Sequence, residues 1–282
     1  MREIDVKDIE NKVEEIFSEI CFKYEDKTLD KLRKALETSE GREKEVLNLL
    51  LENEEVAKSK RIPLCQDTGM AVVYLEVGQE VNFINGDINT AINDGVSKAY
   101  KNNYLRYSIV EEPLFERKNT NNNTPAIIHY EIVKGDKVRI YCLAKGQGSE
   151  NASRVIMLTP ASGIDGVKEE VLKLIKEKGP NACPPLTVGI GIGGSMDSCA
   201  WLAKKALLRN EENNSNPLYA KLEKELLEEI NNLNIGPAGL HGKTTALKVA
   251  IEYAPTHIAG LPLAINLNCH ALRKGEVILW LS

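Results

Sequence analysis

The sequence predicts a mixed α/β (α+β) fold, with a helical N-terminal region followed by interspersed helices and the strands of a mixed sheet. Through most of the first sixty positions, apolar residues recur at steps of three and four, as on one face of an amphipathic helix. Beyond residue 63, short apolar or alternating runs typical of strands are interspersed with helix-like segments. We expect a helical region over residues 1–62 and an α/β region over residues 63–282, together forming one compact subunit without an internal repeat.

The elements expected before residue 151 are defined by periodicity and by turn residues. The turn from Cys65 to Gly69 leads directly into a strand, and such loop-to-strand junctions often carry functional residues. Lys134-Gly135-Asp136-Lys137 separates two strand-like runs and predicts a β-hairpin. In order, we expect helices within residues 1–62, a strand over 71–77, a helix over 87–100, a polar loop over 117–124, strands over 126–133 and 138–143, and a loop over 145–151.

The elements expected in the second half follow the same logic. Gly179-Pro180 is a helix-stop signal, so it ends the helix before it. We expect a helix over 166–177, a strand over 186–192, a helix over 195–208, an exposed connection over 210–217, a helix over 218–233, and strands within 248–253, 263–267 and 277–281.

The composition excludes some classes of partner. Hydrophobic residues make up 43% and charged residues 27% of the 282 positions, as in globular proteins. The net charge of -5 comes from 36 basic and 41 acidic residues mixed along the chain, so no electrostatic argument favours nucleic acid or a membrane surface. No apolar run approaches the roughly 18 residues of a membrane span, and the start is not signal-like. We expect a cytoplasmic protein.

Two glycine-rich motifs suggest nucleotide binding but fit it poorly. Residues 189–194 match G-x-G-x-x-G between a strand and a helix, yet no strand with an acidic end follows at the spacing of a dinucleotide fold. We interpret these glycines as serving close packing or an anion at a helix N-terminus, and keep a nicotinamide oxidoreductase as an alternative. The motif ending in Gly242-Lys243-Thr244 lacks the first glycine of a phosphate loop, where Pro237 stands. Gly242 and Lys243 are better interpreted as a turn that can contact an anion.

The six cysteines divide by their surroundings. A chain of this kind keeps its thiols reduced, either buried as small apolar groups or used for metal and redox chemistry. Three lie in loops or at element ends, two of them near prolines that fix the path of the chain, and this suits metal ligands; a zinc-stabilised binding or scaffold protein is the alternative from another class. The loop cysteines are Cys65, Cys183 and Cys269, and the cysteines expected to be buried are Cys21, Cys142 and Cys199.

The four histidines are less informative. His129 falls in a strand, where a structural role is the usual one. His241, His257 and His270 fall in the glycine-rich or cysteine-bearing C-terminal third, where acid–base or substrate contacts are more plausible. The pattern alone does not rank them.

Six ordered motifs span most of the chain. They are Leu64-Cys65-Gln66-Asp67-Thr68-Gly69, Asn103 to Ser108, Lys145 to Asn151, Ala182-Cys183-Pro184-Pro185, the Gly193-Gly194 turn, and His257 twelve residues before Cys269. Together they resemble the class I, iron–sulfur fumarate hydratases and the related L-tartrate dehydratases. The match is to the α subunit, or to the N-terminal half of single-chain members.

This resemblance implies a cofactor and a set of site residues. Cys65, Cys183 and Cys269 would hold a 4Fe-4S cluster whose fourth iron stays open as a Lewis acid, so residues 63–282 would form the cluster-binding catalytic region. Asp67 would transfer a proton, and His257 would orient it or contact the substrate. The substrate pocket would contain Gln66, Asp67, Arg106, Gly148 and His257, with the planar fork of Arg106 on a carboxylate and Gly148 permitting close backbone approach.

The resemblance also implies a reaction and a partner. The first expectation is reversible hydration of fumarate to (S)-malate, and the alternative is dehydration of L(+)-tartrate to oxaloacetate; the substrate is a small dicarboxylate in either case. Two departures from the family pattern, Gly146-Gln147-Gly148 and His270-Ala271-Leu272, bear on the choice between them. We expect a separate β subunit to supply the rest of the site in an α2β2 heterotetramer, so this chain alone would be nearly inactive.

Overall fold

The structure, a computed structural model, describes residues 2–279 and divides into two compact units. The first unit contains the residues up to Glu25, Glu54–Gly146 and the residues from Arg273 onward. The second contains Asp26–Asn53 and Gln147–Leu272. Helices and mixed sheets occur in both units, so the predicted mixed α/β class is confirmed. The helices expected within residues 1–62 are present but contribute to both units.

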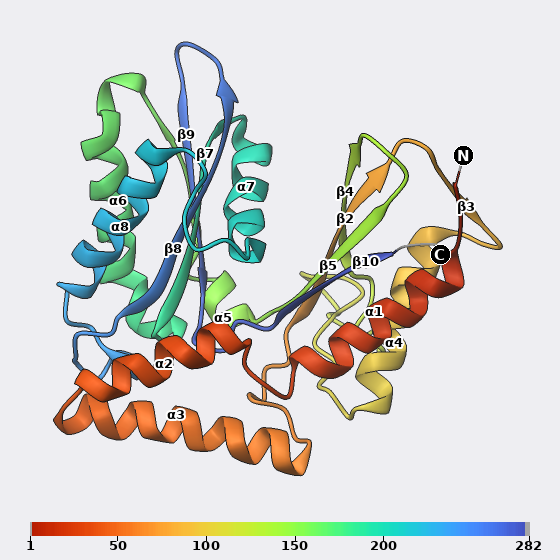
Figure 1. The fold of residues 1–282 in the computed structure, drawn as a ribbon, viewed down its shortest axis with the longest axis horizontal. Coiled ribbons are helices and arrows are strands. Elements are labelled where there is room, and N and C mark those ends of the chain that lie inside the picture. The colour runs from red at the N-terminus through yellow and green to blue at the C-terminus, as the bar shows by residue number, and fades with distance from the viewer. Residues whose placement is uncertain (1, 280–282) are drawn as a thin grey trace. The chain divides into compact units, whose positions relative to one another are not determined.

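The first unit is built around a four-stranded sheet. Its elements are β1 (Arg2–Asp5), α1 (Val6–Ile20), β2 (Met70–Gly78), β3 (Val81–Ile84), α4 (Ile88–Asn102), β4 (Ile127–Val133), β5 (Val138–Lys145) and β10 (Lys274–Leu279). The strand order is β10-β5-β2-β4, with β2 parallel to β4 and antiparallel to β5, and β1 pairs separately with β3 (Figure 1). One core joins apolar side chains of α1, α4 and a face of the sheet, among them Phe17, Val73 and Val96.

The predicted hairpin over residues 126–143 is wrong. The two strands exist as β4 and β5, but β2 lies between them and pairs with both. The connection therefore passes over the end of β2, where the amide of Gly78 donates to the carbonyl of Lys137 at 2.8 Å. A Cβ on Gly78 would lie 2.4 Å from the oxygen of Gly135, so only glycine allows this crossing.

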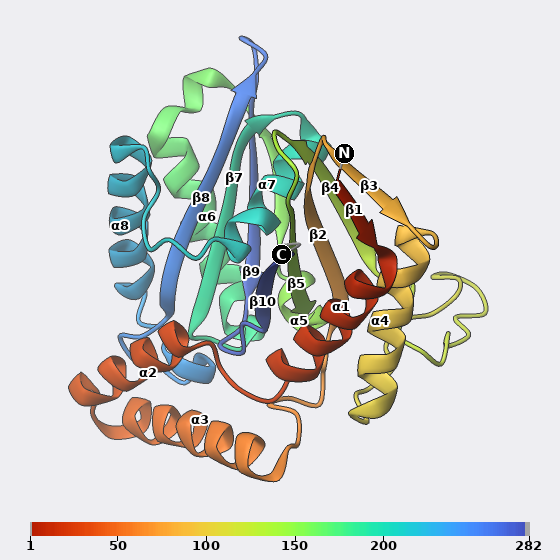
Figure 2. The same ribbon diagram turned by 45° about the vertical axis from the view of Figure 1, so that its right-hand side comes forward.

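The second unit contains a second four-stranded sheet covered by helices on both faces. Its elements are α2 (Asp26–Thr38), α3 (Gly41–Lys60, the part up to Asn53), α5 (Gln147–Glu150), β6 (Arg154–Leu158), η1 (Pro160–Ser162), α6 (Gly163–Lys178), η2 (Gly179–Ala182), β7 (Leu186–Gly194), α7 (Met196–Leu208), α8 (Pro217–Asn231), η3 (Pro237–Gly239), β8 (Ala246–Thr256) and β9 (Leu261–Asn268). The order is β6-β9-β7-β8. Figure 2 shows α6 and α8 on one face and α7 on the other.

The glycines of the G-x-G-x-x-G motif serve packing. They lie within β7 itself, and a Cβ on Gly189 or Gly191 would lie 2.2 Å from a backbone oxygen of α7. Removing both side chains lets α7 lie directly on the strand. The packing interpretation is therefore the one that the structure supports.

Both sheets share one topology, although the sequence shows no repeat. In each, a central strand is parallel to one neighbour and antiparallel to the other, and a further antiparallel strand forms the edge. The edge strands are exchanged: β6 follows β5 in the chain but pairs with β9, and β10 follows β9 but pairs with β5. The first sheet is thus completed by β10, which follows β9 of the second sheet in the chain. The second sheet is completed by β6, which follows β5 of the first sheet.

Most other expected elements are present. The strands over 71–77 and 186–192 and the helices over 87–100 and 195–208 agree with β2, β7, α4 and α7. The edge strand β6 was not expected, and the loop over 145–151 contains the short helix α5. The last expected strand corresponds to β10, with Leu281 outside the described residues. Over residues 2–279, every helix is too short or too polar to cross a bilayer.

Candidate functional site

The first predicted site segment is the turn before β2. It begins where the amide of Leu64 donates to the carbonyl of Cys21 at 2.9 Å, just after α1. Cys65 is half-buried. The Asp67 side chain accepts through Oδ1 from the amide of Gly69 at 3.0 Å. Gly69 has a φ of +83°, and a Cβ there would lie 2.8 Å from the backbone of β5, so glycine is required for the turn to lie against the sheet.

Thr68 brings the distant residue Arg106 to this turn. Its hydroxyl accepts from the amide of Arg106 at 3.0 Å and donates to the carbonyl of the same residue at 3.2 Å. Thr68 is buried, whereas Arg106 is exposed. The pair of bonds therefore fixes the backbone of Arg106 beside Asp67 and leaves its guanidinium at the surface. Thr68 is a site residue that the sequence analysis missed, because a threonine inside a turn carries no distinctive signal.

Two buried cations lie at the same turn. The guanidinium of Arg273, 2% exposed, donates to the carbonyl of Asp67, while its Nε has no hydrogen-bond partner within the described part of the chain. Lys145, at the end of β5, is 1% exposed. A Cβ on Gly146 would lie 3.3 Å from both the Asp67 Oδ2 and the Arg273 Nη2. The two buried cations therefore place positive charge around the Asp67 turn.

The loops that carry Cys183 and Cys269 are joined by a hydrogen bond in the second unit. The amide of His270 donates to the carbonyl of Cys183 at 3.1 Å, which joins the segment before β7 to the segment after β9. Cys183 is exposed and has a φ of 55°, in the left-handed region. Non-glycine residues adopt this conformation at some cost, often at functional sites. The side-chain amide of Asn268 donates to the carbonyl of Cys269 at 2.9 Å and so fixes the second loop.

The donor chemistry fits an iron–sulfur cluster at the loop cysteines and not at the others. Burial raises the pKa of Cys21 and Cys199 to about 11, and it also raises the pKa of Cys142. These thiols stay protonated, whereas a metal ligand must be a thiolate. The three loop thiols are exposed or half-buried. Cys65 belongs to the first unit and the other two to the second, and residues 2–279 contain no preformed group of three or more His, Cys, Asp or Glu side chains around a metal position.

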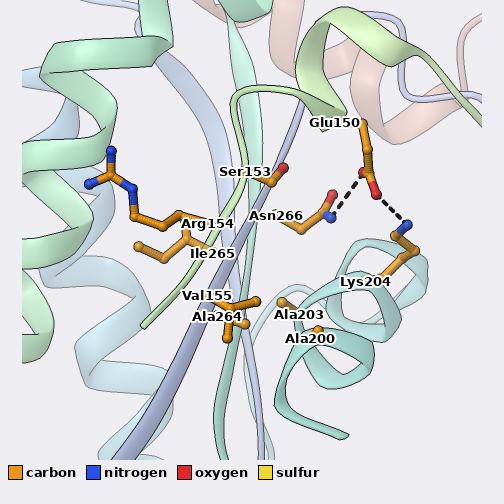
Figure 3. A pocket seen from close by; sticks show the side chains of 10 residues that line it. All are labelled: Glu150, Ser153, Arg154, Val155, Ala200, Ala203, Lys204, Ala264, Ile265 and Asn266. Atoms are coloured by element: carbon orange, nitrogen blue, oxygen red, sulfur yellow. Dashed lines mark hydrogen bonds and ion pairs between the residues drawn. The ribbon is translucent and has the colours of Figure 1, made fainter. Parts of the chain in front are cut away.

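Gly148 lies in α5, whose last residue, Glu150, is held by a polar network that includes side chains of α7 and β9 (Figure 3). Glu150 pairs with Lys204 of α7 at 2.6 Å and accepts from the side-chain amide of Asn266 in β9 at 3.1 Å. Asn266 is 7% exposed, and its Oδ1 has no partner among the residues described. Its amide orientation is therefore set by Glu150. These side chains line a pocket of about 210 Å³, and a Cβ on Gly148 would meet nothing within 4 Å.

His257 is not brought together with the cysteines of its own unit. It follows β8, which runs parallel to β7, so it lies at the Gly194 end of the sheet. Cys183 precedes β7, and Cys269 follows β9 with Asn268 opposite Thr187, so both lie at the other end. The Nδ1 of His257 accepts from the amide of Ala259 at 3.1 Å.

The turn at Gly242 and Lys243 contacts an anion, as the sequence suggests, but the anion belongs to the protein. The carboxylate of Glu43 accepts from the amides of Lys243 at 3.0 Å and Thr244 at 2.8 Å. A Cβ on Gly242 would lie 2.7 Å from the Glu43 carboxyl carbon. This contact ties α3 to the turn before β8.

Comparisons with known proteins agree on one family. A family model described as fumarate hydratase (Fumerase) matches residues 10–278. The chain is 43% identical over 236 residues to a protein of Methanocaldococcus jannaschii named putative L(+)-tartrate dehydratase subunit alpha, which covers 82% of this chain and 83% of the relative. It is 32% identical over 289 residues to proteins of Escherichia coli O157:H7 and K12 named L(+)-tartrate dehydratase subunit alpha, with 99% of this chain and 94% of each relative covered.

Proposed function

We propose, from the premise that this chain belongs to the fumarate hydratase (Fumerase) family, that it is the α subunit of a hydro-lyase for a small dicarboxylic acid. L(+)-tartrate is the first candidate substrate, because relatives matched over most of the chain carry that name. Fumarate, the first expectation from the sequence, becomes the second candidate, supported by the description of the family model. A cytoplasmic location remains part of the proposal.

The observation that carries the proposal is the double hydrogen bond from Thr68 to the backbone of Arg106. These bonds hold Arg106 beside Asp67. The guanidinium of Arg106 can bind a substrate carboxylate in bidentate fashion, and the carboxylate of Asp67 can carry a proton. Elimination of water from tartrate needs both a group that binds the carboxylate and a group that transfers the proton. One carbon loses its proton, the neighbouring carbon loses its hydroxyl group as water, and the resulting enol becomes oxaloacetate.

We assign roles to the candidate residues on this basis. We assign proton transfer to the carboxylate of Asp67, whose Oδ1 accepts from the amide of Gly69 and whose Oδ2 lies on the side of Gly146. Arg106 and Gln66 bind the substrate's polar ends, and Gly148 lets a carboxylate approach the backbone of α5. His257 contacts the substrate or orients Asp67.

The cofactor is proposed from the family and from the donor set. Cys65, Cys183 and Cys269 would hold a 4Fe-4S cluster, because they are the cysteines outside the buried core. When bound, a cluster with three thiolate ligands supplies an open iron that polarises a hydroxyl and a carboxylate.

The partner is a β subunit, because the relatives are named as subunit alpha. We propose an α2β2 assembly in which the β chain supplies the remaining catalytic groups. This chain alone would then be nearly inactive.

The test is anaerobic co-production of the chain with its β partner, followed by assays of tartrate dehydration and fumarate hydration. We expect a brown protein with a higher kcat/KM for tartrate than for fumarate. Replacing Cys65, Cys183 or Cys269 by Ser should remove the visible absorption, whereas Cys142→Ala should keep it. A colourless protein with tightly bound zinc, or an assembly inactive on both acids, would overturn the proposal, and a preference for fumarate would reverse the substrates.

A further inference from the structure

The outer edge of β4 presents open backbone groups. Among the described strands, β4 pairs only with β2, and it ends the sheet of the first unit. The amide of Gln79 donates to the carbonyl of Val133 at 2.9 Å, so the bonds of Val133 point toward β2. Because the bonding direction alternates along a strand, Ile128, Tyr130 and Ile132 direct their amides and carbonyls outward. No side chain within residues 2–279 binds these outward groups.

The equivalent edge of the second sheet is closed by side chains. β8 has the same place there, as the outer strand parallel to the central one. The amide of Ile251 donates to Glu223 at 2.7 Å, and its carbonyl accepts from Arg209 at 2.9 Å and from Asn214 at 2.7 Å. Covering an edge in this way prevents it from pairing with other chains. The two sheets therefore treat equivalent edges differently, and only β8 is covered in this manner.

The sequence of β4 also lacks the features that protect an edge. It contains no Pro, Gly or Lys, and its register with β2 runs without a bulge from Ile127 to Val133. Three of its large side chains are exposed, Ile127 at 41%, Tyr130 at 42% and Ile132 at 67%. β-branched and aromatic residues on an open edge favour the addition of another strand.

The outward groups of β4 are complementary to those of a second β4. When two copies run antiparallel with Tyr130 opposite Tyr130, Ile128 lies opposite Ile132, and every outward amide meets an outward carbonyl. A shift of one residue would set outward groups against groups that bind β2. A larger shift would leave outward groups unpaired at both ends. The register centred on Tyr130 is therefore the one that satisfies the whole edge.

The side chains agree with the same register. On the face of β4 that carries His129, Ile127 lies opposite Val133, and His129 lies opposite Glu131. The first pair is apolar, and the second brings an imidazole to a carboxylate, so neither places like charges together. Tyr130 is held by its hydroxyl, which donates to Asn89 of α4 at 2.7 Å. The centre of the register is thus an ordered aromatic residue.

We propose that two copies of this chain associate through their β4 strands, antiparallel about a two-fold axis at Tyr130, so that one sheet continues from copy to copy. A two-fold interface requires one patch that is complementary to itself, and β4 meets this requirement in its backbone and in its side chains. The inference goes beyond the proposed function: it names the surface between the two α chains of the proposed assembly and depends on no substrate or cofactor.

Single cysteines test the register in the assembly of the chain with its β partner. Tyr130→Cys would place two thiols at the axis, with about 5.5 Å between Cα atoms, within the disulfide range of about 4.4–6.8 Å. Glutathione disulfide should then give a covalent dimer of two α chains on a non-reducing gel. Ile132→Cys alone should not, since its two copies would lie about 14 Å apart along the strands. A mixture of Ile128→Cys and Ile132→Cys chains should cross-link again.

Two aspartate variants test association without cross-linking. Ile132→Asp should weaken association between two α chains by about tenfold or more, seen in sedimentation as a shift from α2β2 to αβ. Ile164→Asp, at a residue of α6 that is 64% exposed, is the matched control and should leave association unchanged. Urea unfolding of both variants checks that each remains folded.

Several results would overturn the proposal. One is a Tyr130→Cys chain that cross-links no more than the wild type with its six native cysteines. Another is equal association of the two aspartate variants. Loss of the β chain from Ile132→Asp with the pair of α chains intact would assign this edge to the β subunit, and so would also refute the pairing of two copies. An assembly inactive on tartrate and fumarate overturns the proposed function instead, whatever the association results.

Discussion

Thr68→Val removes the hydroxyl that joins the turn before β2 to Arg106 while nearly conserving the side-chain volume. Two hydrogen bonds, of 3.0 and 3.2 Å, are lost together. Each neutral bond contributes about 1 kcal/mol net, so we expect the free energy of unfolding to fall by about 2 kcal/mol. With the backbone of Arg106 released, we also expect KM for the dicarboxylate to rise about tenfold, since small misplacements of a substrate-binding group are costly.

Thr68→Ser is the matched control, because it keeps the hydroxyl and loses only a methyl group. Urea unfolding and steady-state kinetics of the two variants are compared in the assembled enzyme. The serine variant should retain most of the stability and nearly the wild-type KM. If the valine variant unfolds at the same urea concentration as the serine variant, or binds substrate equally well, then Thr68 does not position Arg106 and this reasoning fails.

Three further predictions concern packing, pH and the polar network that holds Glu150 of α5. Gly191→Ala should lower the free energy of unfolding in urea by more than about 3 kcal/mol, because its Cβ would lie 2.2 Å from a backbone oxygen of α7. Gly148→Ala, whose Cβ would meet open space, is the control: it should change the free energy of unfolding by less than about 0.5 kcal/mol, yet raise KM. The pKa of Cys21 is raised by burial from 9.0 to about 11, so the wild type should lose stability as the pH rises from about 9 to 11, and Cys21→Ala should lose less; equal losses would argue against a buried neutral thiol. Lys204→Met should raise KM about tenfold, while Lys168→Met, which breaks ion pairs of similar length between α6 and α8, should not; similar KM values for both would refute a role for this network.

Local signals made several elements predictable. Asp87 caps α4 through the amide of Thr90, and Ser195 begins α7 with a capping box, so both helix starts follow from a few neighbouring residues. The apolar run of β7 is likewise visible because the strand is buried on both faces. The separation of buried from loop cysteines also followed from local patterns, since the buried ones stand in or beside helices and strands.

Long-range pairing was not predictable. Two strands joined by a four-residue turn normally form a hairpin, and nothing near residues 134–137 announces that β2, some fifty residues earlier, lies between them. The same limit applies to the site. Thr68 and Arg106 are joined across 38 positions, and Arg273 reaches Asp67 across 206. The place of His257 depends on the parallel direction of β8, which periodicity does not encode.

The exchange of edge strands determines the order in which the chain can be completed during synthesis. In the second sheet, the edge strand β6 is synthesised before β9, the strand with which it pairs. In the first sheet, β5 is synthesised more than 120 residues before its edge partner β10. The first unit therefore begins earliest on the ribosome and finishes last. Until β10 emerges, the edge of β5 remains open to pairing with other chains. A pause or truncation before residue 274 should consequently harm solubility more than the loss of one short strand suggests.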